Sequence, residues 1–553
     1  MQGDFTRQTF DPLRHFSRVL MQQGRVQLDA DWNEQIAILL HYVQTLAADV
    51  IGSHAGSGNG FKIDKEPPGL DVTNDFVISP GHYYVNGILC ELEETPIPIA
   101  VLNDNNTAKV SVYPYVVDHR EFQEGQYVEI FDAALKPDLS PMKFKISKIS
   151  PDQRQLTLEP ALTPAAVDKF NDAQELQLRR ITTYKTQPDY PVQDALNPSS
   201  KYLVYLDVWE RHLSYLEDEG DLNIREVALG GPDTATRTKV VWQVKVKLGD
   251  GPDPELELEH WPALSQAYLR ARAKQEQQLP DPCVTQPDAH YRGAENQLYR
   301  VEIHTGGTVP GEGTQSPPTF KWSRENASVI FPIIKLQDNT AELANLGRDK
   351  HLSLTVGDWV EIVDDDRTLR GEPGPLVQVD AIEPTDMTVT FKPTNARSLP
   401  SYSSDSPNHP LLRRWDYQKG RDNASTVHGL PCNLSDKDNA VRIVESNGDE
   451  TADWFVLEDG VQIQFLKPPE KQPQHSYRSG DYWLIPARTA TGDVEWPREG
   501  GTDQASHQHG AKAMLPHGVE HHYAPLARVS FDNMGKVVEP TDELRKEIVP
   551  TVT

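Results

Sequence analysis

The sequence has little cysteine, no long apolar run and too few cations to balance its acids. Its three cysteines, Cys90, Cys283 and Cys432, are far apart and match neither a disulfide framework nor a paired zinc site, which is typical of a reducing compartment. The longest apolar run of note, IAILL, is far too short to span a bilayer. The start, MQGDFTRQTF, lacks the apolar segment of a secretory signal. We therefore expect synthesis in the cytoplasm and no membrane insertion.

Acidic residues dominate the charge of the chain. There are 54 Lys and Arg residues against 82 Asp and Glu residues, which gives a formal net charge of −28. Phosphate backbones and anionic lipid headgroups repel such a surface, and no basic run offsets it. The composition therefore excludes nucleic acid as a partner and disfavours an anionic membrane.

The length and the turn-forming residues indicate the fold class. A chain of 553 residues is too long for one hydrophobic core, and at roughly 100–200 residues per domain it forms several modules. Its 43 prolines outnumber its 35 glycines, and both interrupt short β-forming segments throughout. We expect a mainly β protein with several β-sandwich and small β-barrel modules and an N-terminal amphipathic helix.

Changes of pattern along the chain predict six segments. An arm and helix that serve assembly come first, and a β-meander with a hairpin turn at Asn86-Gly87 follows. Two barrel-like modules flank a sandwich-like core, and the last module has a turn at Asp459-Gly460. The predicted ranges are 1–60 for the arm and helix, 61–105 for the meander, 106–200 for the first barrel-like module, 201–335 for the sandwich-like core with a helical insertion at 262–279, 336–400 for the second barrel-like module and 401–553 for the C-terminal β module.

The stretch LDADWNEQ spaces Asp29, Asp31 and Asn33 as a calcium-binding loop does. An EF-hand loop needs Gly at its sixth position and Glu at its twelfth, where this chain has Glu34 and Leu40. Asp31 and Glu34 are instead spaced like a capping box, in which each side chain accepts from a free backbone N–H of the first helical turn. The stretch therefore predicts the start of a helix.

An amphipathic helix is predicted from Trp32 to Ile51, with Gly52 at its C-terminal end. Its apolar residues recur at alternating steps of four and three, which places them on one helix face. β-branched residues at heptad position a with Leu at d favour a parallel dimer, but apolar residues at e widen the stripe. Three destinations remain open for this face: the β domain of the same chain, a symmetric, trimeric helix cluster, or another protein. The predicted oligomerisation or docking residues are Trp32, Ile36, Leu39, Leu40, Val43, Leu46 and Val50.

The segments on either side of this helix also bear on assembly. The preceding arm carries Phe5, Phe10 and Phe16 among polar residues, and we expect these three rings to anchor it. The following segment contains four glycines, at 52, 56, 58 and 60, and predicts a flexible joint. A helix fixed to its own domain has less need of a hinge, so the joint favours attachment elsewhere.

An internal repeat links two distant parts of the chain. GQYVEI begins at Gly125 and GDWVEI at Gly357, and each continues through a loop to a strand–turn–strand pattern with an I-x-P turn. We therefore predict that residues 125–161 and 356–393 adopt the same small β fold. GDYWLI, which begins at Gly480, is a partial match that we interpret as an ordinary strand entry.

No catalytic or cofactor motif is present. The chain has no nucleophile elbow and no HExxH, and the glycine-rich HTGGTVPGEG lacks the Lys-Ser/Thr of a phosphate-binding loop. The acidic run at 364–366 is expected to be a solvated loop in so acidic a chain. A histidine-dense stretch is the best metal candidate, but it is rich in Gly and Gln and is typical of an exposed loop, so we predict no metal, cofactor or catalytic residue. Its histidines are His507, His509, His517, His521 and His522.

Several blocks of the sequence resemble an uncharacterised bacterial family whose members tend to be encoded with phage-tail-like contractile injection systems. The blocks are GDFTRQTFDPLRHFSRVLMQQGRVQLDADWNEQ, YLDVWERHLSYLED, ALGGPDTATRTKVVWQVK, FKWSRENASVIFP and GDYWLIPARTATGDVEWP, and they span nearly the whole chain. The N-terminal region, together with ISPGHYYVNG, is also similar to phage baseplate and fibre-attachment proteins. Neither resemblance carries an established activity or any catalytic residue.

The resemblance implies a structural component of a contractile injection particle, associated with its baseplate or spike or forming an appendage. Its partners would be the other particle proteins and further copies of itself, with a trimer as one arrangement. The chain would be made in the cytoplasm and then belong to an assembled particle that can be released from the cell. The alternatives are a polysaccharide hydrolase or esterase associated with the particle, and a cargo toxin.

Overall fold

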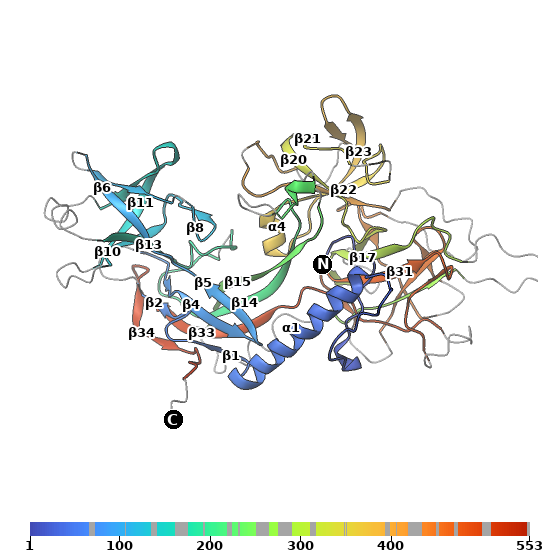
Figure 1. Ribbon diagram of the computed structural model, residues 1–553, viewed down its shortest axis with the longest axis horizontal. Helices are drawn as coiled ribbons and strands as arrows, with labels where there is room; N and C mark the ends of the chain where they lie inside the picture. Colours follow the sequence, from blue (N-terminus) through green and yellow to red (C-terminus); the bar gives the residue numbers. More distant parts are fainter. Residues whose placement is uncertain are drawn as a thin grey trace, which may run out of the picture.

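The chain is built from two β-sandwiches, and each sandwich carries one six-stranded β-barrel (Figure 1). This architecture, seen in a computed structural model, confirms the predicted fold class of a mainly β protein with sandwich and barrel modules and an N-terminal helix. The structure describes residues 1–65, 72–104, 107–114, 116–133, 141–160, 175–191, 194–217, 224–229, 233–249, 265–274, 290–309, 317–347, 349, 351–392, 399–404, 406–417, 434–448, 453–468, 474–499 and 510–549.

Sandwich 1 combines a three-stranded sheet and a four-stranded sheet around one core. The strand β14 (Lys201–Leu213) is central in the larger sheet and almost wholly buried, so its sequence YLVYLDVW is nearly continuously apolar. Side chains of both sheets, including Tyr83, Leu206 and Trp242, pack in the shared core. The smaller sheet consists of β1 (His54–Gly56), β4 (Gly81–Val85) and β5 (Ile88–Leu92). The larger sheet consists of β14 together with β15 (Arg237–Leu248), β33 (His522–Phe531) and β34 (Val537–Glu543). Beside them, β2 (Ile63–Asp64) pairs with β3 (Val77–Ile78).

Barrel 1 is inserted in the chain between β5 and β14. Apolar side chains that alternate along its strands, such as Val128, Ile130 and Phe144, fill its interior. A hairpin of β8 (Val116–Val117) and β9 (Arg120–Glu121) projects from it. Its strands are β6 (Ile97–Asp104), β7 (Thr107–Val112), β10 (Tyr127–Asp132), β11 (Met142–Ser150), β12 (Gln155–Glu159) and β13 (Leu176–Ile181).

Sandwich 2 lies in the chain between β15 and β33, two strands of the larger sheet of sandwich 1. Aromatic side chains such as Phe320, Phe465 and Trp483 dominate its core. One sheet consists of β17 (Gln297–Thr305), β19 (Thr319–Ser323), β26 (Val441–Arg442), β31 (Tyr482–Arg488) and β32 (Asp493–Val494). The other sheet consists of β16 (Tyr268–Ala273), β27 (Glu445–Ser446), β28 (Phe455–Val456) and β29 (Val461–Leu466). A separate pair is formed by β18 (Gly307–Thr308) and β30 (Ser476–Tyr477).

Barrel 2 is inserted between β19 and β26 of sandwich 2. Its interior is filled by Phe331, Leu336, Val360, Val379 and Phe391 among others. Its strands are β20 (Ile330–Gln337), β21 (Thr340–Leu343), β22 (Trp359–Val363), β23 (Leu376–Glu383), β24 (Thr388–Phe391) and β25 (Leu411–Trp415), and the short helix α4 (Asp365–Arg370) follows β22. The described residues outside barrel 2 also contain three short 3-10 helices, η1 (Pro12–Arg14), η2 (Pro151–Gln153) and η3 (Val227–Leu229).

The two barrels have the same topology. Barrel 1 closes in the order β10-β11-β12-β7-β6-β13 and barrel 2 in the order β22-β23-β24-β21-β20-β25, so the strands correspond one to one along the chain. Both have a register shift at the matching place, between Ile146 and Lys148 in barrel 1 and between Val379 and Ala381 in barrel 2. These findings confirm the prediction that residues 125–161 and 356–393 share a fold, and they extend the duplication to all six strands.

A matching pair of buried arginines supports this correspondence. Arg180 on β13 and Arg414 on β25 stand in the same short sequence, Leu-Arg-Arg, opposite Val128 and Val360. Arg180 donates to two backbone carbonyl oxygens of the loop before β10, at 2.8 and 2.5 Å. Arg414 does the same to the loop before β22, at 2.7 and 2.9 Å. Each arginine therefore fixes the loop that enters the third strand of its barrel.

Four of the predicted segments need correction. The helical insertion predicted at 262–279 is wrong over Tyr268–Ala273, which forms the strand β16 paired with β29; its alternating pattern of apolar and long polar residues fits a sheet whose partner lies far along the chain. The C-terminal segment is no separate module, because β29 and β31 complete sandwich 2 and β33 and β34 complete sandwich 1. The barrels also begin and end differently from the predicted ranges, at Ile97–Ile181 and Ile330–Trp415.

The predicted glycine joint after the first helix is not a flexible hinge. Residues His54–Gly56 form β1, which is buried and paired with β4. A Cβ atom on Gly56 would lie 2.4 Å from a ring carbon of Tyr83, and one on Gly60 would lie 2.5 Å from the backbone oxygen of His82. Glycine is needed here because the backbone approaches its neighbours closely.

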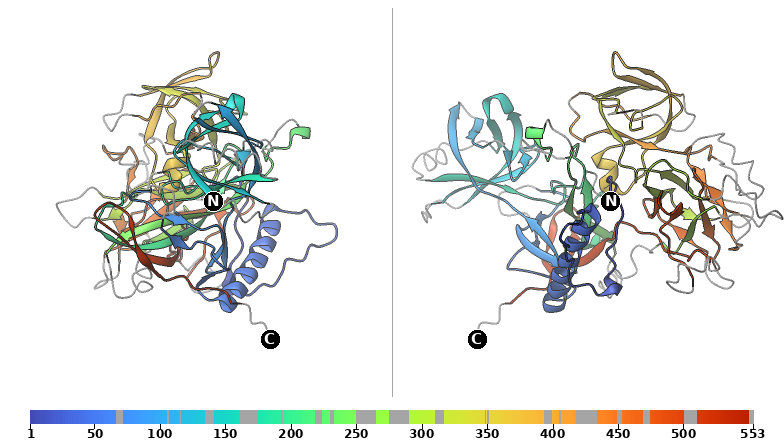
Figure 2. Two further views of the ribbon diagram at one scale, coloured as in Figure 1. Left: turned by 90° about the vertical axis from the view of Figure 1, so that its left-hand side faces the viewer. Right: turned by 45° about the vertical axis from the view of Figure 1, so that its right-hand side comes forward.

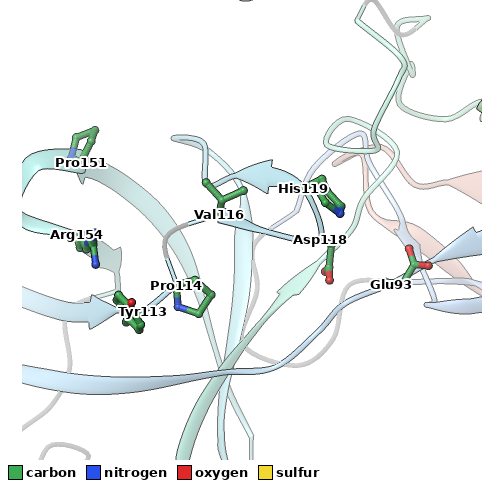
Figure 3. A pocket seen from close by; sticks show the side chains of 8 residues that line it. All are labelled: Glu93, Tyr113, Pro114, Val116, Asp118, His119, Pro151 and Arg154. Carbon is green, nitrogen blue, oxygen red and sulfur yellow. The ribbon is translucent and has the colours of Figure 1, made fainter. Parts of the chain in front are cut away.

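An open groove of about 920 Å³ lies on barrel 1 beside the β8–β9 hairpin (Figure 3). One end carries Tyr113 and Pro151 with the Arg154 guanidinium, whose central carbon lies 5.0 Å from the centroid of the Tyr113 ring. The other end carries polar side chains, Asp118 and His119 from the hairpin turn among them. The groove thus combines one exposed ring with groups that donate and accept hydrogen bonds.

Glu94 ties barrel 1 to sandwich 1, and the stability of this junction is expected to depend on pH. Its carboxylate accepts from the backbone N–H of Thr182 at 2.8 Å, where the chain leaves the barrel. Burial raises the pKa of Glu94 to about 7 from 4.5, although hydrogen bonds with Thr182 lower it. Because the folded state favours the protonated carboxyl, its stabilising contribution is complete below pH 4.5 and is lost as the pH rises through about 7. The protection of the Thr182 amide, taken relative to its intrinsic exchange rate at each pH, should therefore fall over this range in the wild type.

Two variants test this expectation. Glu94→Gln should flatten the dependence of Thr182 protection on pH, since the glutamine side chain cannot ionise. Glu121→Gln, which changes an exposed glutamate of the β8–β9 hairpin, should leave the dependence unchanged. An equal slope in the wild type and in Glu94→Gln would assign the dependence to another group.

Candidate assembly surface

The N-terminal helix α1 (Asp29–Ile51) lies along the side of the molecule, outside both sandwiches (Figures 1 and 2). Only Ala30 and Ile38 are fully buried in it. Its seat on sandwich 1 is the β4–β5 hairpin turn, where a Cβ atom on Gly87 would lie 2.0 Å from the backbone oxygen of Gln44. Asn86 and Gly87 have φ values of 48° and 78°, as in the predicted type I′ turn. The helix thus rests on Ala30 and Ile38 and against a glycine of the hairpin turn.

The helix begins three residues earlier than predicted, and the arm stabilises its first turn. Asp29 accepts from the backbone N–H of Thr6 at 2.9 Å and also from its hydroxyl. Burial alone would raise the pKa of Asp29, but these hydrogen bonds outweigh it and lower the pKa. Glu34 accepts from the hydroxyl of Thr9 at 2.6 Å. The predicted capping pair of Asp31 and Glu34 is therefore wrong, because a distant segment supplies the partners.

The apolar face of α1 points to solvent. In heptad terms, positions a and d and the large residues at e and g face outward, whereas most of the buried and half-buried residues fall at b, c and f, such as Ala30 at b and Ile38 at c. All seven predicted oligomerisation or docking residues are exposed, and Tyr42 at position g is exposed beside them. The exposed fractions are 64% for Trp32, 47% for Ile36, 50% for Leu39, 42% for Leu40, 62% for Val43, 65% for Leu46 and 77% for Val50. We call these seven residues and Tyr42 the α1 face.

Two of the three predicted arm anchors pack within the chain. Phe5 makes an edge-to-face contact with the His212 ring of β14, with centroids 6.2 Å apart. Phe10 packs on the His41 ring of α1 at 5.8 Å. Phe16 remains 46% exposed, with only the Arg14 guanidinium over its ring at 4.4 Å. The arm is thus fixed at its start and along α1, and its later part adds to the exposed apolar surface.

Exposed apolar side chains are concentrated in this region. More than half of the large hydrophobic side chains that are exposed in the described part of the chain lie within residues 1–51, including Leu13, Leu20 and Val26 of the arm. Monomeric soluble proteins rarely leave such a contiguous patch uncovered. The helix contains no Lys or Arg, and Asp49 is its only charge at an e or g position. The surface is therefore apolar at its centre and nearly uncharged at its flanks.

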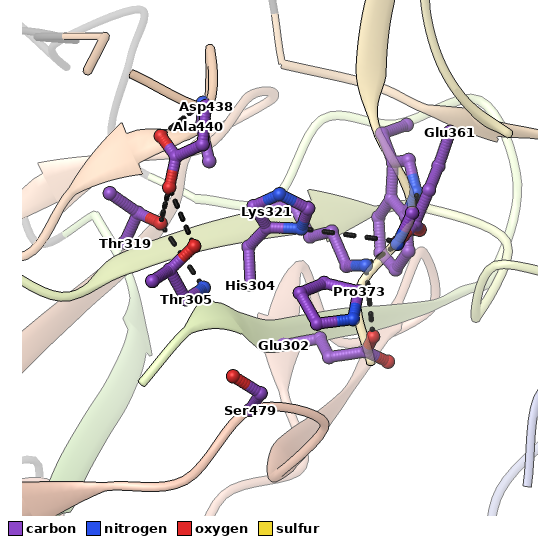
Figure 4. Close-up of polar contacts among 12 residues, drawn as sticks. Glu302, His304, Thr305, Thr319, Lys321, Glu361, Pro373, Asp438, Ala440 and Ser479 are labelled. Carbon is purple, nitrogen blue, oxygen red and sulfur yellow. Dashed lines mark hydrogen bonds and ion pairs between the residues drawn. The ribbon is translucent and has the colours of Figure 1, made fainter. Parts of the chain in front are cut away.

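A buried ionic cluster joins barrel 2 to sandwich 2 (Figure 4). The Lys321 ammonium of β19 lies 2.6 Å from a Glu361 carboxylate oxygen and 3.2 Å from a Glu302 carboxylate oxygen, and all three side chains are less than a tenth exposed. The Trp415 indole N–H donates to Glu361 at 2.9 Å, and its ring lies under the ammonium. Nothing in the spacing of these residues along the sequence indicates that they meet, and they fill the space between the two units.

The His304 imidazole lies at the edge of this cluster (Figure 4). Its Nδ1 is 3.9 Å from a Glu361 carboxylate oxygen, and burial, followed by the Lys321 charge, lowers the pKa of His304 to about 4. Asp438 accepts from the hydroxyls of Thr305 and Thr319 at 2.7 Å each. These contacts tie β17, β19 and the segment before β26 together.

The acidic run at 364–366 is structured rather than solvated. Asp364 caps α4 by accepting from the Arg367 backbone N–H at 2.8 Å. Asp365 pairs with Arg211 of β14 and with His409. The prediction of a solvated loop is wrong because α4 docks barrel 2 on sandwich 1, where the carboxylates meet partners distant in sequence.

The histidine-dense stretch divides at the edge of the described residues. His507 and His509 lie outside them. His521 Nδ1 lies 2.7 Å from an Asp207 carboxylate oxygen and its ring stacks on Trp209, while His517 packs against Tyr482. The His522 ring is paired with the Asn86 side chain at 3.0 Å. Within the described residues, no three His, Cys, Asp or Glu side chains are grouped as metal ligands.

Comparison with known proteins gives a family for the chain. None of the described helices is both long and apolar enough to cross a bilayer. No curated protein and no solved structure matches the sequence. A model described as a family of unknown function, DUF6519, matches residues 1–113, 180–259 and 257–537, and leaves out 114–179, which hold most of barrel 1. Because the matched segments cover far more than half of its residues, the chain belongs to the DUF6519 family.

Proposed function

We propose that the chain is a structural component of a phage-tail-like contractile injection particle, mounted at the baseplate or spike or as an appendage, and that α1 attaches it. The observation that carries this proposal is the outward orientation of the α1 face. The resemblance of the sequence blocks to proteins encoded with such particles supports the choice of assembly. Within it, α1 is the element that binds and the barrels are the bodies that it positions.

We propose that further copies of α1 cover the α1 face, in a parallel trimer. Positions a and d carry Ile36, Val43 and Val50 with Trp32, Leu39 and Leu46, the residue classes that pack as knobs into holes. Leu40 at e and Tyr42 at g widen the stripe beyond what one partner helix covers, which favours three helices over two. With Asp49 as the only charge at e or g, little repulsion opposes parallel copies.

The free energy that burial of the α1 face can supply is large for so short a helix. Full burial of one Leu, Ile or Val side chain stabilises by about 1.5–3 kcal/mol, and the α1 face leaves roughly half or more of each such side chain in water. An isolated helix of this length is marginal, but α1 is already held by the arm and by Gly87. The ordering cost of association is reduced accordingly.

The double variant Leu39→Asp with Val43→Asp tests the proposal. The wild type should sediment as a trimer and occur in purified particles at a fixed symmetric copy number. The variant should be a monomer and be lost from particles, because a buried carboxylate costs more than the apolar contact gains. Its circular dichroism should match the wild type, since both side chains are half exposed in the single chain.

A control variant places two carboxylates at exposed apolar residues outside the α1 face. It separates the effect of the position from the effect of the added charge. Leu248→Asp with Val356→Asp changes residues 68% and 64% exposed outside the α1 face, and it should keep the wild-type mass and incorporation. A wild-type chain that is monomeric and absent from particles would contradict the proposal in favour of delivered cargo. A double variant that still forms trimers would place the interface elsewhere.

A further inference from the structure

The groove of barrel 1 lies where barrel 2 carries different side chains, although the two barrels share one topology. By strand register and the hydrogen bonds at the ends of β7 and β21, Tyr113 corresponds to Ala344, and Arg154 corresponds to Met387. Arg154 and Met387 even share a turn conformation, with φ values of 50° and 51°. The ring and the guanidinium at this end of the groove are therefore particular to barrel 1 and are not required by the shared fold.

The walls of the groove are held in place before any ligand binds. The β8–β9 turn places Asp118 and His119 at φ values of 52° and 56°, and the Thr95 backbone N–H donates to Asp118 at 3.1 Å. The Arg180 guanidinium donates to two backbone carbonyl oxygens of the hairpin and so holds the hairpin in place. Arg120 donates to the backbone oxygen of Glu93, which lines the polar end. A rigid wall lowers the entropy lost on binding.

The chemistry of the groove fits a ligand rich in hydroxyl groups. The Tyr113 side chain is 68% exposed with Arg154 over its ring, so the tyrosine offers a stacking surface to solvent. Carboxylates at Glu93 and Asp118 accept hydrogen bonds, and the Arg154 guanidinium donates them. A groove for a proline-rich peptide presents several large aromatic side chains, whereas Tyr113 is the only Phe, Tyr or Trp among the lining residues. A net charge of −28 disfavours an anionic polymer.

We propose that the groove of barrel 1 binds a neutral oligosaccharide, with one sugar ring stacked on Tyr113 and its hydroxyl groups hydrogen bonded by Arg154, Glu93 and Asp118. Its volume of about 920 Å³ lies within the range of small-molecule sites and admits a few sugar units. The residues that the DUF6519 model leaves out, 114–179, contain most of this groove. Tyr113 and Glu93 lie within the matched segment 1–113, whereas the other six lining residues lie in the unmatched one. The inference does not depend on the proposed assembly role.

Saturation-transfer NMR and calorimetry with three tetrasaccharides, of glucose, mannose and N-acetylglucosamine, test the site on the full chain. At least one should bind at millimolar concentration. Tyr113→Ala and Arg154→Met, which introduce the residues of barrel 2, should each weaken binding about tenfold, as expected for the loss of a stacking or charge-assisted contact worth about 1.4 kcal/mol. Met387→Ala, at the position in barrel 2 that corresponds to Arg154, should leave the affinity unchanged.

Three results would overturn the proposal. These are no binding of any of the three sugars at millimolar concentration, equal affinity of the wild type and Tyr113→Ala, or an equal loss in Met387→Ala. Both groove variants change surface side chains, so their thermal unfolding should match the wild type. A binding loss accompanied by unfolding of barrel 1 in Tyr113→Ala would be separated from loss of the site by Tyr113→Phe, which keeps the ring and should retain binding.

Discussion

Lys321→Met is expected to lower the free energy of unfolding of sandwich 2 and barrel 2 by about 3–5 kcal/mol, the cost of breaking a buried ion pair on one side. Lys321 is the cation shared by Glu302 and Glu361, and all three are buried. Methionine fills a similar volume but leaves Glu361 with only the Trp415 and Gly374 N–H groups as hydrogen-bond donors. Urea unfolding followed by circular dichroism measures the loss, and amide exchange of β19 and β22 locates it.

The loss of stability in Lys321→Met should also depend on pH. Burial would raise the pKa of Glu302, but Arg300 and Lys321 outweigh burial and lower it to about 2. Because the folded-state pKa is depressed, the stability from Glu302 is complete above its unfolded pKa of 4.5 and is lost as the pH falls toward 2. The difference between wild type and Lys321→Met should therefore shrink on acidification below pH 4.5. A constant difference across this range would show that methionine acts through packing alone.

Barrel 1 offers a matched control for this variant. Glu129 occupies the place of Glu361 in the duplicate, and Lys143 lies 3.9 Å from it. Glu129 is also paired with Arg179 at 2.6 Å, and Arg179 is 42% exposed, so Glu129 keeps a cation without Lys143. Lys143→Met should therefore cost less than about 1 kcal/mol.

Gly87→Ala is expected to unseat α1 while the sandwiches stay folded. The residue has a φ of 78°, which costs alanine about 1–2 kcal/mol, and the added Cβ would lie 2.0 Å from the Gln44 backbone oxygen. Backbone cannot rotate away as a side chain can, so the helix or the hairpin must shift. Amides of α1 should exchange markedly faster, and trimer formation should weaken with them.

The strain of a positive φ must be separated from the clash. Gly480 has a φ of 86°, and an added Cβ there meets nothing within 4 Å. Gly480→Ala should therefore show the conformational cost alone, with α1 exchange as in the wild type. If Gly87→Ala and Gly480→Ala lose equal stability and α1 exchange is unchanged in both, the hairpin turn is not the seat of the helix.

Elements that depend on neighbouring residues could be predicted from the sequence. The period of three and four gave the helix to its C-terminal residue, Ile51, and Asn86-Gly87 gave its hairpin. The two copies of the Gly-x-aromatic-Val-Glu-Ile pattern gave the shared barrel fold. Pairings between distant segments could not be predicted: β16 resembles a helix because alternating Leu, Ala and Arg also suit one, and only its partner β29 decides the matter.

The same holds for the candidate site, where features set by local spacing could be predicted and contacts between distant segments could not. The seven residues of the helix stripe follow from spacing, but spacing does not say which side of a helix a body covers. The small residues opposite the stripe, Ala30, Ala37 and Ala48, were the available signal, since a helix can lie close to a body on such a face. Gly87 meets Gln44 at 43 residues' distance in sequence, and Lys321 meets Glu302 and Glu361 at 19 and 40, so no local pattern connects them.

The insertion of sandwich 2 between β15 and β33 has a consequence for synthesis on the ribosome. Barrel 1 and barrel 2 are each continuous in sequence, so each can close soon after its last strand emerges. The strand β14 has no second neighbour until β33 has been translated, more than 300 residues later. One edge of this apolar strand therefore stays unpaired during most of elongation. An unpaired strand edge is prone to aggregation. Nascent chains stalled before His522 should accordingly depend on holdase chaperones, and release of β33 and β34 should end that dependence.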